Sequence, residues 1–164
     1  MLAMRWLLID KFTAIRKGEY ASAVRGVTRS EGALVDDFPA FPVMPPTLLM
    51  EMMAQVGGVL TGATIGFSKE VVLAKISRAR FFSRVTPPAL LTIEARLAEA
   101  GDDLAVTECR VLQSEAAVAE AVIFFGLFSQ LDGRQGRSVV FSTDFMESFA
   151  IPEVLGRSPA EEVR

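Results

Sequence analysis

The chain has 164 residues, of which 51% are hydrophobic, and its formal net charge at pH 7 is −3. This length and composition predict one domain with a large core, and the negative charge argues against a nucleic-acid-binding protein, because phosphate binding needs clustered lysines and arginines. The chain lacks histidine, the commonest general base and metal ligand, so we expect no metal site. Its single cysteine, Cys109, cannot form an internal disulfide, so we expect a reducing, cytoplasmic compartment.

The pattern of the N-terminal residues predicts two strands, and we expect no targeting segment before them. The apolar start, Met1–Ile9, contains Arg5 and is not followed by a small-residue cleavage site, so we do not expect a signal peptide. Residues 5–28 have the pattern of two strands around a turn at Lys17-Gly18-Glu19.

A long helix is predicted after a proline-rich loop at 29–44. Pro45 and Pro46 suit the first helical turn, because the N–H that proline lacks would be unpaired there anyway. The helix runs from about Thr47 to about Thr64, and it is apolar on most sides. Such a helix is expected to be buried on most sides.

Four strands are predicted after the helix, separated by turn residues: VVLAKISRARFF, LLTIEARLAEA, LAVTECRVLQS and AAVAEAVIFFGLF. The last of these contains Glu120 and is too short to span a bilayer. Two strands, one buried helix and four further strands predict an α+β domain, in which a curved antiparallel sheet wraps around the helix.

One carboxylate, Glu51, lies within the apolar helix, next to Met50, Met52 and Met53. Buried acids are rare unless they are paired or functional, which favours a role in a site; the alternative is a carboxylate that reaches water. Gln55 follows four residues later, on the same helical face. The methionines are typical of core packing, and they would also suit the wall of an adaptable apolar tunnel.

Four segments between Arg5 and Ser129 carry a family pattern: RWLLIDKF, GVTRSEGALVDDFPAFPVMP, LLMEMMAQVGGVL and SRARFFSRVTPPALLTIEARL. Their most specific part is FP-x-x-P-V-M-P, followed by E-x-x-x-Q on the helix. With these motifs the chain resembles the 3-hydroxyacyl-acyl-carrier-protein dehydratases of fatty acid synthesis, which have the hot-dog fold.

The resemblance implies a chemistry that two subunits share. In the family, a loop histidine of one subunit removes the α-proton of a 3-hydroxyacyl thioester, and a helix carboxylate of the other protonates the departing hydroxyl. An N–H at the start of that helix polarises the thioester carbonyl, and the acyl chain lies in a tunnel at the dimer interface. The substrate arrives on phosphopantetheine, so the implied partners are acyl carrier protein or CoA thioesters, with no further cofactor.

Carried over residue by residue, the resemblance places Glu51 at the helix carboxylate, Gln55 at the glutamine that orients it, and Asp37 at the histidine. The family's Met-Pro-Gly motif becomes Met44-Pro45-Pro46, so proline replaces the glycine that supplies the N–H, and a later family glycine is Pro88. The implied substrate-binding residues are Phe38, Met44, Pro45, Pro46 and Met50.

These departures predict impaired or absent dehydration. A free aspartate, with a pKa of about 3.9, is a far weaker base than imidazole, although aspartate bases for α-protons exist. Proline has no N–H at all, and losing one oxyanion donor costs on the order of 10²–10³ in rate. We therefore expect an acyl-thioester-binding homodimer or higher homo-oligomer. The alternatives are a hot-dog thioesterase that uses a carboxylate and a non-catalytic partner of another hot-dog subunit.

The resemblance divides the chain into a hot-dog domain, residues 1–130, and a C-terminal extension, residues 131–164. In the extension, Phe141, Phe145 and Phe149 are four residues apart, which predicts a short helix with one aromatic face that Pro152 ends. Asp144 and Glu147 have the spacing of a capping box. We expect this helix to pack on the outer face of its own sheet; the alternative is a position across the tunnel mouth or the partner subunit.

Overall fold

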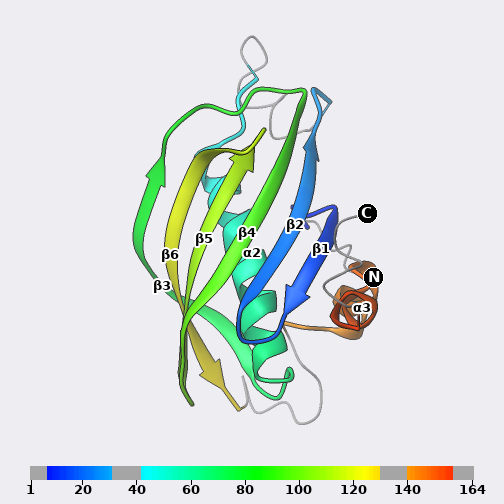
Figure 1. Ribbon diagram of the computed structural model, residues 1–164, viewed down its shortest axis with the longest axis vertical. Helices are drawn as coiled ribbons and strands as arrows, with labels where there is room; N and C mark the ends of the chain where they lie inside the picture. The colour runs from blue at the N-terminus through cyan, green and yellow to red at the C-terminus, as the bar shows by residue number, and fades with distance from the viewer. Residues whose placement is uncertain (1–6, 31–41, 130–139, 157–164) are drawn as a thin grey trace.

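The computed structural model describes residues 7–30, 42–129 and 140–156. Its elements, in chain order, are β1 (Lys11–Arg16), β2 (Tyr20–Val27), α2 (Pro46–Thr64), β3 (Glu70–Phe81), β4 (Ala89–Ala100), β5 (Leu104–Gln113), β6 (Ala116–Phe128), α3 (Thr143–Ser148) and α4 (Ile151–Leu155). The strands form one antiparallel sheet in the order β1-β2-β4-β5-β6-β3, which curls around α2 (Figure 1). The predicted α+β architecture is therefore confirmed.

The predicted turns and helix start are also present. Gly18 turns β1 into β2 with a φ of +77°, a conformation that glycine adopts without strain. Ser114 and Glu115 join β5 to β6, and both have positive φ angles, as a two-residue hairpin turn of the favoured twist requires. Pro46 occupies the first position of α2.

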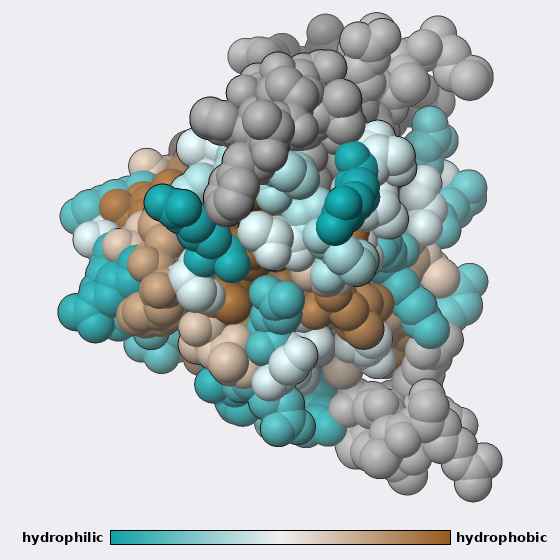
Figure 2. Space-filling model, turned by 90° about the horizontal axis from the view of Figure 1, so that it is seen from above, coloured by the Kyte–Doolittle hydropathy of each residue, from teal (hydrophilic) through white to brown (hydrophobic). Residues whose placement is uncertain are grey.

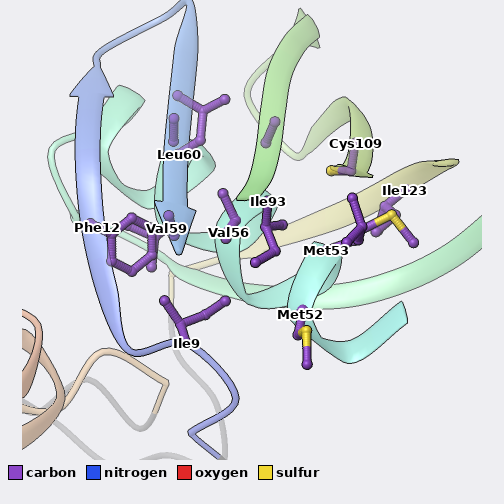
Figure 3. Close-up of a cluster of buried hydrophobic side chains, with 14 of the residues drawn as sticks. Ile9, Phe12, Met52, Met53, Val56, Val59, Leu60, Ile93, Cys109 and Ile123 are labelled. Carbon is purple, nitrogen blue, oxygen red and sulfur yellow. The ribbon is translucent and has the colours of Figure 1, made fainter. Parts of the chain in front are cut away.

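The core lies between α2 and the concave face of the sheet (Figure 3). Met52 and Met53 are fully buried in it, so the core-packing interpretation of these two methionines is the one observed. A Cβ atom on Gly57 would lie 2.8 Å from Thr107 Oγ1 and 3.2 Å from Cys109 Sγ. The absence of a side chain at Gly57 therefore lets α2 approach β5 closely.

The outer face of the sheet carries paired charges. Arg110 Nε donates to Glu94 Oε2 at 2.6 Å, and the Tyr20 hydroxyl donates to Glu94 Oε1 at 3.0 Å. The Arg96 guanidinium lies 5.2 Å from the centre of the Tyr20 ring. Strand residues thus alternate between an apolar face towards α2 and a charged face towards solvent, which is the period-two pattern of a half-buried sheet.

The aromatic face predicted for the C-terminal helix is present. The ring centres of Phe141 and Phe145 are 5.8 Å apart, and those of Phe145 and Phe149 are 5.0 Å apart. The predicted cap is wrong, because Ser142 precedes the helix and its Oγ accepts a hydrogen bond from Phe145 N at 3.2 Å. A hydroxyl bonded to the N–H three residues on is the preferred N-cap arrangement.

Two further expectations about this segment are wrong. Pro152 does not end the helix: α3 ends at Ser148, Ala150 adopts a left-handed conformation, and Pro152 lies in the first turn of α4. Nor does the segment cover the outer face of the sheet. Phe149 packs edge-on against Phe12, at 5.5 Å between ring centres, and Phe12 belongs to the core on the helix side of the sheet. That side offers the apolar surface that three phenylalanines need, whereas the outer face is charged.

Candidate functional site

Glu51 and Gln55 form a hydrogen-bonded pair on α2, as their spacing predicts. Gln55 Nε2 donates to Glu51 Oε1 at 3.0 Å, and Gln55 Oε1 accepts from Leu8 N at 3.1 Å. The N-terminal segment therefore holds the glutamine amide with its NH₂ group towards the carboxylate. An amide fixed on both sides fixes the orientation of the acid beside it.

Both side chains line a pocket of about 190 Å³, which we call the Glu51 pocket. The helix contributes Glu51, Ala54, Gln55 and Gly58. The other walls come from β3, β6 and the C-terminal segment: Val71, Leu73, Phe125, Val140, Phe141 and Phe145. A mostly apolar hollow with a few converging polar groups is the usual form of a small-molecule site. Glu51, half-buried at its wall, can hold or transfer a proton next to an apolar ligand.

The other predicted site residues that the structure describes are not among those that line this pocket. Met44 is buried, and its N–H donates to Val85 O at 2.8 Å. Pro45 and Met50 are half-buried, and Pro46 is exposed. Their substrate-binding roles stay predictions. Asp37 and Phe38 lie outside the described residues.

The start of α2 lacks the donor that the family pattern places there. Pro46 has no N–H, and the N–H groups of Leu48 and Leu49 both bond to the carbonyl of Pro45. A thioester carbonyl at this end of the helix therefore finds no N–H at the Pro46 position.

A second hollow, of about 170 Å³, lies on the outer face of the sheet among arginines and glutamates. Arg110 is paired with Glu94, and Arg80 Nη1 lies 3.6 Å from Glu120 Oε1. Exposed pairs of this kind are typical of a solvated protein surface. The Glu51 pocket is therefore the better candidate for an acyl group.

The Cys109 thiol is not part of the site. It is buried behind α2, and burial raises the pKa of this thiol to about 12. We therefore expect the thiol to be inert, because the thiolate is the reactive form.

Sequence reasoning missed the walls that β3, β6 and the C-terminal segment contribute. The only signal for Phe141 and Phe145 was their four-residue spacing in the extension, which predicts a helix face but not its contacts. In the described ranges, no three Cys, Asp or Glu side chains gather as metal ligands would. No described helix is long and apolar enough to cross a membrane.

The fold and the site define an α+β domain in which a carboxylate–amide pair on the central helix faces an apolar pocket. The model of the FabA-like domain matches residues 2–122. The chain is 31% identical, over 123 residues, to the 3-hydroxyacyl-[acyl-carrier-protein] dehydratase FabZ of Desulforamulus reducens, which covers 74% of this chain and 87% of that protein. It is 32% identical over 123 residues to the FabZ of Psychrobacter arcticus, covering 72% of this chain and 84% of that protein. The chain therefore belongs to the FabA-like family.

Solved structures confirm the hot-dog fold. A dehydratase heterocomplex, ApeI:P from Xenorhabdus doucetiae, superposes with a TM-score of 0.64 at 17% identity, over 76% of this chain and 85% of that one. The smu.793 protein of Streptococcus mutans, bound to acetyl CoA, gives a TM-score of 0.62 at 15% identity, over 77% and 94%. A hypothetical thioesterase with coenzyme A from Streptococcus pneumoniae gives 0.60 at 13% identity, over 73% and 86%.

Proposed function

We propose that this protein binds acyl thioesters in the Glu51 pocket and dehydrates 3-hydroxyacyl thioesters poorly or not at all. The observation that carries the proposal is the Glu51–Gln55 pair, held by Leu8 N and open to an apolar hollow. In a FabA-like protein this is the position of the family's helix carboxylate. The acyl chain would lie along the apolar walls, and its carrier would be acyl carrier protein or CoA in the cytoplasm.

Two departures support impaired dehydration. The α-proton would have to be removed by Asp37, whose ordinary pKa of about 3.9 makes it a weak base at neutral pH. The thioester carbonyl would lack an N–H donor at Pro46. Because the base and the oxyanion donor act in the same step, their losses combine in the rate of that step.

Thioester hydrolysis is the second candidate activity. The Glu51 carboxylate borders a pocket and could direct a water molecule towards a thioester carbonyl without histidine. Hydrolysis would still need a group that stabilises the oxyanion. Dehydration of a 3-hydroxyacyl thioester gives an enoyl thioester, whereas hydrolysis gives a free thiol, so an assay of the products distinguishes the two activities.

The edge of the sheet supports a homodimer. β3 is a terminal strand of 12 residues, and Leu73, Ile76 and Phe81 on it are 42%, 40% and 43% exposed. Figure 2 shows apolar surface on the left of its view, the side on which β3 lies in Figure 1. A long edge strand with exposed apolar side chains is a template for pairing with another strand. Since Leu73 also lines the Glu51 pocket, a second copy on β3 would lie beside the site.

In such a dimer, Asp37 of one subunit would face Glu51 of the other, as the resemblance implies. The same edge could instead accept a different hot-dog subunit, which would make this chain the non-catalytic partner. Sedimentation of the purified chain separates these arrangements. A stable dimer, which Ile76→Lys converts to a monomer, supports the homodimer; a monomer that dimerises only with a second hot-dog protein supports the heteromer.

The activity is tested with acyl-carrier-protein and CoA thioesters, each with and without a 3-hydroxyl group. Binding without turnover supports the proposal. Free thiol released from both kinds of thioester, and lost in Glu51→Gln, would establish the thioesterase. Enoyl product formed at the rate of a FabZ relative would refute the impaired dehydration.

A further inference from the structure

The C-terminal extension supplies one wall of the Glu51 pocket. The FabA-like match ends at residue 122, and Phe141 and Phe145 lie well beyond it. Both line the pocket together with Glu51. The extension therefore adds to the site a surface that the family pattern does not contain.

This wall is anchored on both sides of the pocket. Glu70, at the start of β3, is only 8% exposed, and its Oε2 accepts a hydrogen bond from Val140 N at 3.0 Å. The Phe141 ring packs edge-on against Phe67, at 5.1 Å between ring centres. On the far side, Phe149 packs against Phe12. A hydrogen bond from a backbone N–H to a carboxylate is a strong one. Together these contacts hold the segment in place at the edge of the pocket.

Phe145 is the member of this wall whose change alters the pocket and leaves the core in place. Phe141 and Phe149 belong to the buried core, whereas Phe145 is half-buried and lines the pocket. The pocket volume is about 190 Å³, and an apolar cavity of about 150 Å³ admits a molecule the size of benzene. With the phenyl ring in place, the pocket is therefore suited to a short acyl chain.

We propose that Phe145 is a specificity-determining residue that limits the length of the acyl chain accepted next to Glu51. The inference rests on the proposed function, because it assumes that the pocket holds an acyl group. The ring forms part of the pocket wall, so a smaller side chain at this position would leave more room for a longer acyl chain.

The test uses the full-length protein and S-acyl phosphopantetheines with butanoyl, octanoyl and dodecanoyl chains, with binding measured by calorimetry. Phe145→Ala is expected to raise the affinity for octanoyl relative to butanoyl by about tenfold, the gain from burying roughly two more methylene groups. Met146→Ala is the matched control, since Met146 is the next residue and also half-buried, and it packs against the core without lining the pocket. Phe145→Leu, expected to give a smaller shift of the same sign, covers the case in which the alanine variant does not fold.

The outcomes separate the two proposals. A wild-type protein that binds none of the three thioesters overturns the proposed function and, with it, this inference. A wild-type protein that binds them, with the same length preference in folded Phe145 variants, overturns the inference alone. An equal shift in Met146→Ala also overturns it, because the effect would then come from loosening α3 and not from opening the pocket.

Discussion

Phe149→Ala tests whether the C-terminal extension is part of the domain core. The Phe149 side chain is 5% exposed and makes edge-on contacts with Phe12 and Phe145, at 5.5 and 5.0 Å between ring centres. Phe12, a residue of β1, is fully buried. The substitution removes a ring that connects the extension to the main core. It leaves a cavity next to Phe12, which is itself held by the core around it.

Truncating a buried phenylalanine to alanine costs about 3–5 kcal/mol of unfolding free energy. We expect the unfolding free energy to fall by about 3 kcal/mol, at the low end of this range, because a short terminal segment can relax around the cavity more easily than a central strand. For a chain of this size that loss lowers the melting midpoint by about 6–12 °C. Differential scanning calorimetry measures it directly.

The control is Phe128→Ala, the same chemical change at a side chain that is 46% exposed. It is expected to lower the midpoint by less than half as much, because less apolar surface leaves water at that position. An unchanged midpoint in Phe149→Ala would refute the reasoning. It would mean that the extension unfolds separately and that the domain core is complete without it.

Three further predictions concern Gly57, Cys109 and the two departures from the family motifs. Gly57→Ala would place a Cβ 2.8 Å from Thr107 Oγ1, so we expect a loss of about 1–3 kcal/mol in urea unfolding; an unchanged transition would contradict the close approach of α2 to β5. Burial raises the pKa of the Cys109 thiol to about 12, so a thiol reagent at mildly alkaline pH should label it only after unfolding; rapid labelling of the native protein would count against that burial. Asp37→His combined with Pro46→Gly restores an imidazole base and an N–H donor, and it should raise enoyl formation by on the order of 10²-fold or more; no gain would show that other residues limit the reaction.

The fold was predictable because local and long-range patterns agree. The alternation of residues 20–27, the turn at Gly18 and the apolar helix each require the neighbouring element that the structure supplies. The order of strands in the sheet, β1-β2-β4-β5-β6-β3, was not predicted, because alternation and turns do not determine which strands pair. Where local signals compete, the prediction was less accurate. Ser142 and Asp144 are both favourable N-cap residues, and Ser142 is the one that caps α3.

The site was predictable only in part. The pairing of Glu51 with Gln55 depends on helical spacing, which the sequence contains. The contact of Phe145 with the same pocket joins residues 94 positions apart, as the difference between 145 and 51 gives. No periodic pattern determines such a contact. The prediction that α3 packs on the outer face was wrong. Period-two alternation shows that a sheet has one apolar face, but it does not show how much of that face the central helix leaves uncovered.

A crystal structure with a stable analogue of the ligand tests the central proposal most directly. The analogue would be an octanoyl phosphopantetheine in which an amide replaces the thioester, bound to the Phe145→Ala protein and to the wild type. The proposal predicts electron density for the acyl chain against Ala54, Gly58 and Phe125, with the amide carbonyl near Glu51. An acyl chain in the charged hollow on the outer face, or a Glu51 pocket that stays closed to the analogue in both proteins at saturating concentration, would contradict it.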